Sequence, residues 1–229
     1  MNLAIDIGNT AVKWATFDGH TLVDSGLATD ADALPAVGGF DRVLACASGN
    51  PQWLDTELPR LDSTTHLPIA IDYLTPNTLG PDRIAAACGA WALHRGEACM
   101  IVDAGTCITA DLLDANGTYH GGVIMPGLKM NLQALHTFTA KLPLLDIANI
   151  RTATMPGRST EESIVAGTLG TTLLALRGIA DTYGAKAAGL RVLLTGGDAE
   201  LLARNLQWEH QHHLTLMGLN EIMMNNDNE

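Results

Sequence analysis

Two short turns in the chain contain the residue types that bind phosphate groups. They are Asp6-Ile7-Gly8-Asn9-Thr10 and Asp103-Ala104-Gly105-Thr106, and each follows an apolar run typical of a buried strand. Glycine lets backbone N–H groups approach an anion, and amide or hydroxyl side chains add donors. An aspartate at the strand end can hold hydrated Mg²⁺, which prefers oxygen ligands. Two such turns facing each other would clamp a polyphosphate, with Lys13 adding a positive charge, although one such turn alone also fits an ordinary strand–turn connection.

A second group, Gly80-Pro81-Asp82-Arg83, has the residue types needed to phosphorylate an alcohol. Proline at the first helical position predicts a helix over residues 81–94, because the first turn needs no N–H donor. Asp82 and Arg83 would then lie in the first turn. Phosphoryl transfer benefits from a base at the hydroxyl and a cation near the developing charge. The same pair is also common as plain helix capping, so both interpretations stay open on these residues alone.

Other nucleotide-binding motifs are absent or ambiguous in the sequence. The nearest approach to a P-loop, GVIMPGLK, has Leu128 where the motif needs lysine, and G-x-G-x-x-G does not occur. The glycine-rich corner over residues 121–127 would either admit a ligand or close a hairpin. Gly196-Gly197-Asp198 precedes a predicted helix, whose N-terminus favours anions, but its aspartate suits a helix cap better.

The elements that must position these residues occur in two similar series. Hydrophobic periodicity predicts strands at 2–7, 11–17, 21–27, 42–47, 99–102, 108–113, 119–124 and 191–195. It predicts helices at 52–58, 81–94, 128–138, 160–183 and 199–206, and glycines 167 and 170 indicate close packing against another helix. The two phosphate turns lie 97 residues apart, and Arg42-Val43-Leu44 matches Arg191-Val192-Leu193 149 residues later. We therefore expect two β-β-β-α-β-α copies, residues 1–96 and 97–229, although chance similarity of short apolar motifs is the alternative.

Composition limits the function classes. The 229 residues are 47% hydrophobic and 17% charged, enough for one large or two smaller packed domains. A net charge of −12 argues against nucleic-acid and membrane-surface partners. The first residues lack signal-peptide features and the apolar stretch over 84–93 is too short to span a bilayer, so we expect a cytoplasmic protein. Four cysteines in apolar stretches are expected to be buried reduced thiols, and the histidines at 210, 212 and 213 to be solvated.

Taken in order, these motifs resemble the type III pantothenate kinases, which belong to the acetate and sugar kinase, heat-shock ATPase and actin superfamily. The matching segments cover nearly the whole chain: AIDIGNTAVK, TPNTLGPDRIAA, IVDAGTCIT, GGVIMPGL, RSTEESIVAGT and LLTGGDAELL. The resemblance implies an α/β protein with a duplicated ribonuclease H-like (actin-like ATPase) fold, an ATP cleft between two similar halves, and a homodimer. It also implies ATP-dependent phosphorylation of pantothenate to 4′-phosphopantothenate, the first step of coenzyme A biosynthesis.

The resemblance also implies residue roles. Asp82 matches the proton acceptor that activates the pantothenate hydroxyl. Asp6 is placed near Mg²⁺, Asp103 matches the ligand of an activating monovalent cation (K⁺ or NH₄⁺), and Thr106 matches an ATP contact. The substrate contacts are matched by Tyr73, Gly80, Pro81, Asp82, Arg83 and Thr160. The segment that binds ATP phosphates is matched by Asp6, Ile7, Gly8, Asn9, Thr10, Ala11, Val12 and Lys13.

Two other functions are compatible with this resemblance. One is a non-catalytic regulatory relative, because the family includes homologues described as accessory factors for transcription; the other is a same-fold kinase for a sugar or other small alcohol. The chain is short for the family and compact after Leu58, which affects the expected dimer surface more than the chemistry.

Overall fold

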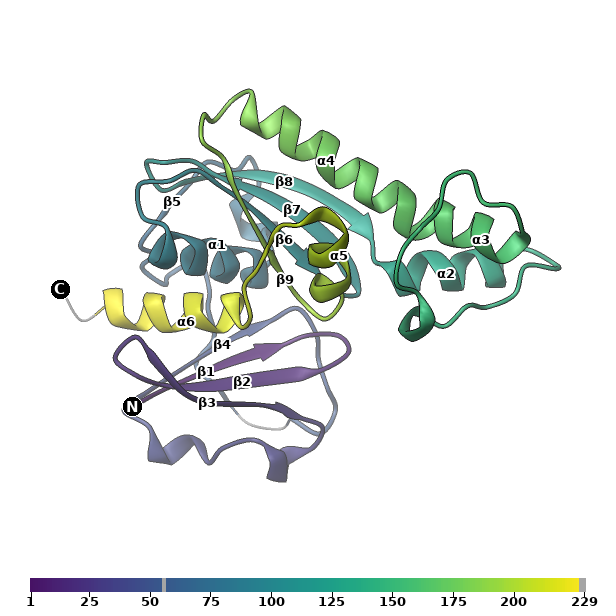
Figure 1. Cartoon of the computed structure of the whole chain (residues 1–229). Coiled ribbons are helices and arrows are strands. Elements are labelled where there is room, and N and C mark those ends of the chain that lie inside the picture. Colours follow the sequence, from purple (N-terminus) through teal and green to yellow (C-terminus); the bar gives the residue numbers. More distant parts are fainter. Residues whose placement is uncertain (55–56, 227–229) are drawn as a thin grey trace. The chain divides into compact units, whose positions relative to one another are not determined.

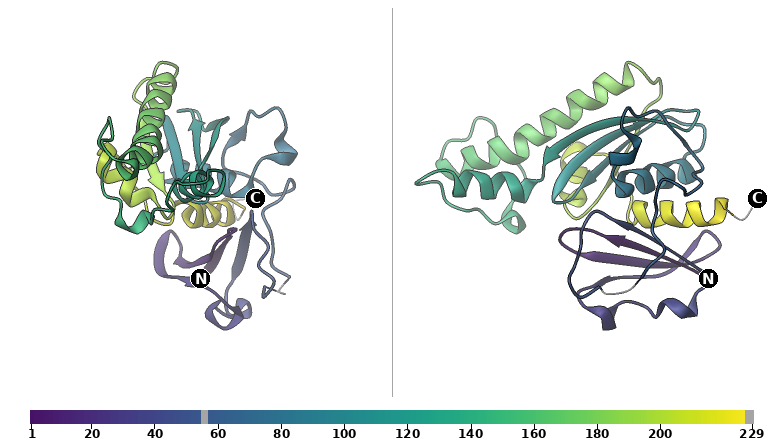
Figure 2. Two further views of the ribbon diagram at one scale, coloured as in Figure 1. Left: turned by 90° about the vertical axis from the view of Figure 1, so that its right-hand side faces the viewer. Right: turned by 180° about the vertical axis from the view of Figure 1, so that it is seen from behind.

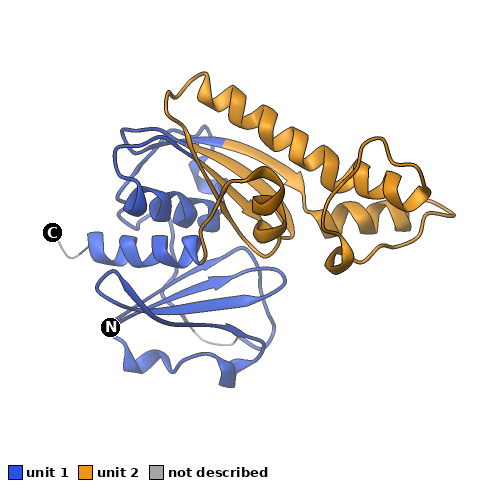
Figure 3. Cartoon of the chain, in the orientation of Figure 1, with its two compact units in different colours: residues 1–99, 113–121, 213–229 blue, residues 100–112, 122–212 orange. Residues whose placement is uncertain are grey.

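The computed structural model describes residues 1–54 and 57–226 and divides into two compact units (Figure 3). Unit 1 comprises Met1–Cys99, Leu113–Gly121 and His213–Glu229, and unit 2 comprises Met100–Leu112 and Gly122–His212. These units are defined by contacts, whereas the expected halves, 1–96 and 97–229, are defined by a sequence repeat. The boundary near residue 96 therefore stays a prediction.

The sheet of unit 1 has four strands: β1 Asn2–Ile7, β2 Val12–Asp18, β3 Thr21–Ala28 and β4 Arg42–Ala47. Their order is β3-β2-β1-β4 (Figure 1). The β1–β2 and β2–β3 pairs are antiparallel, and β4 runs parallel to β1. The apolar residues Leu3, Ile5 and Val12 are buried, which explains why these runs form strands. This register places Asp6 between Lys13 of β2 and Cys46 of β4.

Two helices complete the packing of unit 1, α1 Pro81–Leu93 and α6 Leu214–Asn225. Helix α6 packs against both β1 and α1 (Figures 1 and 2). The two helices cross closely at Gly89 and Gly218. A Cβ atom at Gly218 would lie 1.7 Å from the carbonyl oxygen of Ala85, and one at Gly89 would lie 2.3 Å from that of Leu214. Glycine is therefore required at this crossing, where α1 packs against α6.

The second sheet repeats the order of the first. Its strands are β5 Ala70–Ile71, β6 Cys99–Ala104, β7 Cys107–Leu113, β8 Thr118–Pro126, β9 Arg191–Thr195 and β10 Glu209–His210. They are ordered β10-β9-β6-β7-β8-β5, so the inner strands β8-β7-β6-β9 correspond to β3-β2-β1-β4. The expected α/β class with a duplicated ribonuclease H-like fold is confirmed.

The helices of unit 2 are α2 Leu128–Thr137, α3 Thr160–Val165, α4 Thr171–Gly184 and α5 Ala199–Leu206. The single helix expected over 160–183 is interrupted by a π-helical turn, Ala166–Gly170. The core joins buried strand residues such as Val102 and Ile108 to Leu132, Leu169 and Leu202 of the helices. Short 3₁₀ turns span Ala31–Ala33, Val37–Gly39, Pro76–Thr78 and Ile147–Asn149.

Several local expectations differ from the structure. The strand expected over 119–124 is longer in the structure, because β8 spans Thr118–Pro126 and includes most of the glycine-rich corner. Of the helix expected over 52–58, Gln52 and Trp53 form a turn, residues 57–58 are not helical, and residues 55–56 lie outside the described part. Cys107 is exposed, whereas the other three cysteines are buried as expected.

We expected no stretch of the sequence to be long and apolar enough to span a membrane, and one helical stretch differs from this expectation. Thr160–Gly184 is long and apolar enough to cross a membrane by length and composition. In unit 2 it also contributes buried side chains, Ile164, Leu169 and Leu176, to the core. A core helix meets the same criterion.

Candidate active site

Asp6 lies at the carboxyl end of β1, next to a lysine and a thiol. The β1–β2 register pairs Asp6 with Lys13, and the thiol of Cys46 donates a hydrogen bond to Asp6 Oδ1 (3.5 Å). Burial raises the pKa of Asp6; Lys13 and the Cys46 hydrogen bond oppose this, and the charge of Asp82 adds to it. Because burial disfavours the charged form of a carboxylate, a bound cation would stabilise ionised Asp6.

The turn after β1 is closed by a backbone hydrogen bond and leaves two of its residues exposed. Gly8 N–H donates to the carbonyl of Ala11 (3.0 Å), and Asn9 and Thr10 are exposed. The turn rests on Gly49, where a Cβ would lie 2.2 Å from the carbonyl oxygen of Gly8. Gly49 N–H also donates to the carbonyl of Ile7 (2.9 Å). The segment after β4 therefore packs against the turn and holds it by a backbone hydrogen bond.

Asp82 lies in the first turn of α1 and is near Asp6 within unit 1. Its Oδ1 accepts a hydrogen bond from the backbone N–H of Arg83 (2.9 Å). Gly80, the residue before the helix, leaves room for this carboxylate, because a Cβ there would lie 2.5 Å from Oδ1. Asp82 also contributes to raising the pKa values of Asp6 and Cys46, mainly raised by burial. The carboxylates of Asp6 on β1 and Asp82 on α1 therefore interact electrostatically within unit 1.

Tyr73 and Arg83 lie together beside the same helix start. The Arg83 guanidinium carbon is 6.0 Å from the ring centroids of both Tyr73 and Tyr119. The two tyrosine rings are tilted against each other, with centroids 6.2 Å apart. This arrangement orients a cation through two aromatic faces.

In unit 2, the Asp103–Thr106 turn is enclosed by two glycines. A Cβ at Gly196, where φ is +98°, would lie 2.4 Å from Asp103 Oδ1 and 2.5 Å from the carbonyl oxygen of Ala104. A Cβ at Gly127 would lie 2.4 Å from the carbonyl oxygens of Gly105 and Thr106. The turn therefore depends on backbone approach from the segments that precede α2 and α5.

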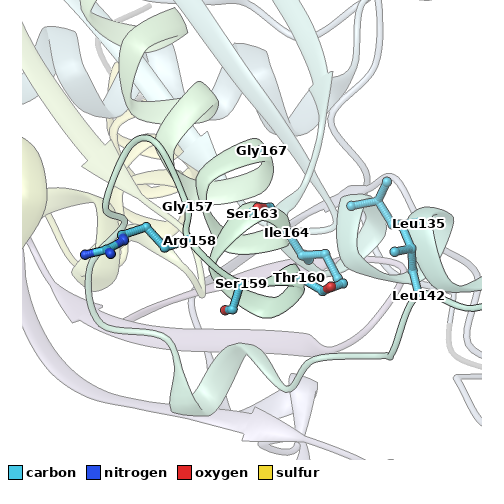
Figure 4. A pocket seen from close by; sticks show the side chains of 9 residues that line it. All are labelled: Leu135, Leu142, Gly157, Arg158, Ser159, Thr160, Ser163, Ile164 and Gly167. Atoms are coloured by element: carbon cyan, nitrogen blue, oxygen red, sulfur yellow. The ribbon is translucent and has the colours of Figure 1, made fainter.

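Thr160 lines a pocket of unit 2 with a volume of about 700 Å³. Its lining residues, shown in Figure 4, are Leu135, Leu142, Gly157, Arg158, Ser159, Thr160, Ser163, Ile164 and Gly167. Ser159 caps α3 by accepting from the N–H of Glu162 (3.1 Å), which fixes where Thr160 begins the helix. Arg158 extends away from the two leucines in this view. One side of the pocket is therefore apolar and the other carries hydroxyl groups.

Comparison with known proteins decides which family has this arrangement. Residues 43–182 match the family model described as type III pantothenate kinase. A type III pantothenate kinase of Bacteroides fragilis is 38% identical over 242 residues, covering 99% of both chains. The chain belongs to the type III pantothenate kinase family. The resemblance seen in the sequence is thereby confirmed.

Solved structures agree on the fold of this family member. A crystal structure described as a conserved putative Baf family transcriptional activator from Campylobacter jejuni has a TM-score of 0.67 at 21% identity, covering 99% of this chain and 100% of that one. A glucokinase from an Antarctic psychrotroph has a TM-score of 0.51 at 14% identity, with 98% of both chains covered. At these identities the likeness shows the fold alone, which is the sugar kinase and actin-like ATPase fold.

The donor set fits the cations expected of such a kinase. Among residues 1–54 and 57–226, no group of three or more histidine, cysteine or acidic residues could hold a metal ion by itself. Mg²⁺ is usually held by one or two carboxylates together with substrate phosphates and waters, so Asp6 suits it without a protein cage. In unit 2, the Asp103 carboxylate packs against Gly196, and the Ala104 carbonyl oxygen accepts from the N–H of Asp198 (2.9 Å).

The expected residues are divided between the two units. Unit 1 holds Asp6, Lys13, Tyr73 and residues 80–83, and unit 2 holds Asp103, Thr106 and Thr160. In unit 2, Thr160 lines a pocket to which neither Asp103 nor Thr106 contributes. Sequence reasoning missed the supporting residues Cys46 and Gly49. Cys46 lies inside the strand expected over 42–47, at the position paired with Asp6. Gly49 belongs to the Gly-Asn-Pro turn that follows this strand in the sequence, which was the one available signal for it.

Proposed function

We propose that this chain transfers the γ-phosphoryl group of ATP to the 4′-hydroxyl of pantothenate, giving ADP and 4′-phosphopantothenate, the first step of coenzyme A biosynthesis. Membership of the family supports this activity. The observation that carries the residue assignment is the electrostatic interaction between Asp82 and Asp6, two carboxylates on different elements of unit 1. Asp82 suits the role of proton acceptor, and Asp6 suits the role of ligand for the Mg²⁺ that accompanies the nucleotide.

Asp82 is the proposed catalytic residue. It accepts the hydroxyl proton as the new oxygen–phosphorus bond forms, while the bond between the γ-phosphorus and the ADP oxygen breaks. Its Oδ1 is oriented by the Arg83 N–H, and Gly80 keeps the adjacent space open. A base held in this way needs little reorganisation before proton transfer.

The segment from Asp6 to Lys13 is the proposed ATP-phosphate site. The exposed residues Asn9 and Thr10 would donate hydrogen bonds to phosphate oxygens, with Lys13 adding a positive charge. The N–H of Gly8 donates within the turn, to the carbonyl of Ala11. Asp6 would hold Mg²⁺, which neutralises developing charge on the phosphates. The remaining members of this proposed site are Ile7, Ala11 and Val12.

The acceptor side is assigned to Tyr73 and residues 80–83 of unit 1, and Thr160 of unit 2 is proposed by itself as a further substrate contact. The Arg83 guanidinium, oriented by the tyrosine rings, suits the carboxylate of pantothenate. Thr160 is supported as a contact by its place in the wall of the pocket that also has the apolar residues Leu135 and Leu142.

Asp103 is the proposed ligand of a monovalent cation, K⁺ or NH₄⁺, and Thr106 a proposed ATP contact. The carboxylate of Asp103, a hard oxygen ligand near the end of β6, supports the first assignment. The exposed position of Thr106 at the end of the turn supports the second.

A cytoplasmic homodimer is the proposed state of the protein. Unit 2 exposes several large apolar side chains, which favours a protein partner. They are Ile124, Met130, Phe138, Leu144, Met155 and Leu174. Light scattering over a range of protein concentrations should give the mass of two chains; the mass of one chain throughout would contradict the dimer.

The test of the activity is ADP release in the presence of pantothenate, ATP, Mg²⁺ and K⁺. We expect turnover that requires pantothenate and is absent with sugars or other alcohols in its place. Turnover with a sugar would indicate the same-fold kinase instead. Binding to a transcription component without turnover would indicate the accessory-factor alternative.

A further inference from the structure

His120 of β8 lies between two carboxylates of unit 1. Its Nδ1 is 3.1 Å from Asp72 Oδ2, and its Nε2 is 3.0 Å from Asp114 Oδ2. Asp114 belongs to the β7–β8 turn, where its Oδ1 accepts from the N–H groups of Asn116 and Thr118. Asp72 belongs to the segment that leads to Tyr73. His120 therefore links the loop before Tyr73 to the hydrogen-bonded turn of the β7–β8 hairpin.

The same hairpin supports Tyr73 directly. Asp72 N–H donates to the carbonyl of Tyr119 (2.9 Å). The ring of Tyr73 rests on Gly121, where φ is +82° and a Cβ would lie 2.9 Å from the ring. Arg83 lies 6.0 Å from the rings of both Tyr73 and Tyr119. The position of Tyr73, and through it that of Arg83, thus depends on contacts of residues 119–121.

We propose that His120 is a positioning residue for pantothenate binding, holding Asp72 and thereby Tyr73 in the conformation that receives the substrate. This rests on the proposed contacts of Tyr73 and Arg83 with pantothenate. His120 does not touch substrate; it raises the fraction of molecules in which Tyr73 is in place. An affinity falls in proportion to the fraction of competent molecules, so loss of the link raises the KM for pantothenate.

The charge of His120 strengthens this link. Protonated imidazole donates from both ring nitrogens, whereas neutral imidazole has one N–H and can donate to one carboxylate. The hydrogen bond with Asp114 raises the pKa of His120 above its ordinary value, and Asp72 raises it further. Partial burial of the imidazole opposes this shift. Asp72 and Asp114 are the charged groups that face it. The double link is complete below about pH 6.5 and is lost as pH rises through the higher pKa of the folded protein.

The experiment compares His120→Ala with the wild type over this pH range. Below about pH 6.5, we expect the variant to raise the pantothenate KM about three- to fivefold, as befits partly exposed charge pairs, with kcat and the ATP KM unchanged. The ratio of the two pantothenate KM values should fall toward one as pH rises, because the wild type loses the same link. His20→Ala, at a side chain 69% exposed beside Glu221, is the matched control and should keep wild-type constants.

A double-mutant cycle separates positioning from general destabilisation. Asp72→Asn should raise the pantothenate KM, and adding it to His120→Ala should change little more, because both remove one link. An unchanged pantothenate KM in His120→Ala, or a pH-independent ratio, would overturn the proposal. So would equal losses in kcat, ATP KM and melting temperature, since those indicate a structural role.

Tyr73→Ala distinguishes failure of this proposal from failure of the site assignment. A raised pantothenate KM in Tyr73→Ala but not in His120→Ala would refute positioning by His120 and leave the assignment of Tyr73 standing. No effect in Tyr73→Ala would refute the assignment itself.

Discussion

Replacing Asp82 by asparagine should remove the proton acceptor while leaving the fold of the site intact. The asparagine side chain can still accept the hydrogen bond that Asp82 Oδ1 receives from the Arg83 N–H at 2.9 Å. The start of α1 is therefore kept, and the free energy of unfolding should change by less than about 1 kcal/mol. A positioned base contributes about two to four decades in rate, so kcat should fall at least about a hundredfold, or about 2.7 kcal/mol.

The nucleotide side should respond differently to this substitution. The charge of Asp82 helps to raise the pKa of Asp6, so its removal lowers that pKa and leaves Asp6 ionised for Mg²⁺. Steady-state kinetics with ATP varied at saturating pantothenate should give an ATP KM within about twofold of the wild type. A kcat close to that of the wild type, or an ATP KM that rises as much as kcat falls, would refute the catalytic role of Asp82.

Three other substitutions test the phosphate turn, the crossing of α1 and α6, and the proposed monovalent-cation ligand. Gly49→Ala places a Cβ 2.2 Å from the carbonyl oxygen of Gly8, so the phosphate turn must move; the ATP KM should rise roughly tenfold or more while the pantothenate KM is kept. Gly218→Ala places a Cβ 1.7 Å from the Ala85 carbonyl oxygen, and urea unfolding should show a loss of about 1–3 kcal/mol or more. Asp103→Asn should abolish stimulation by K⁺ in an assay that uses Na⁺ as the control; full stimulation in the variant would exclude Asp103 as the cation ligand.

The sheet core was predictable because its strands are short apolar runs bounded by turn residues. The runs at 2–7, 42–47 and 191–195 form strands over the residues expected, and the helix at 199–206 has the expected bounds. The strands were predictable from hydrophobic periodicity and the turn residues that follow them. The helix was predictable from the glycine turn and the capping residue before it. The recurrence of Asp6 and Asp103 at matched strand ends indicated the duplicated fold for the same reason.

Features that depend on contacts distant in sequence were not predictable. Helix α6 was not anticipated, because its residues are apolar on most sides and are buried between elements far earlier in the chain. Gly167 and Gly170 were expected at a helix crossing, but a Cβ at Gly167 would meet nothing within 4 Å and one at Gly170 would meet Met155. The close crossing is made by Gly89 and Gly218, which only tertiary structure brings together.

The same limit applies to the site. Asp6 and Asp82 were identified by motif, yet their proximity follows from the packing of α1 in unit 1. The support of Tyr73 by Gly121 and His120 depends on pairing of β5 with β8, and β5 is two residues long, too short for a periodic signal.

Identification of the reaction product tests the central claim most directly. The protein would be incubated with pantothenate, ATP, Mg²⁺ and K⁺, and the product examined by phosphorus NMR and mass spectrometry. We predict one phosphate ester at the 4′-hydroxyl of pantothenate, formed in equal amount to ADP. ADP formed without a phosphorylated pantothenate, or no ADP at all, would contradict the account.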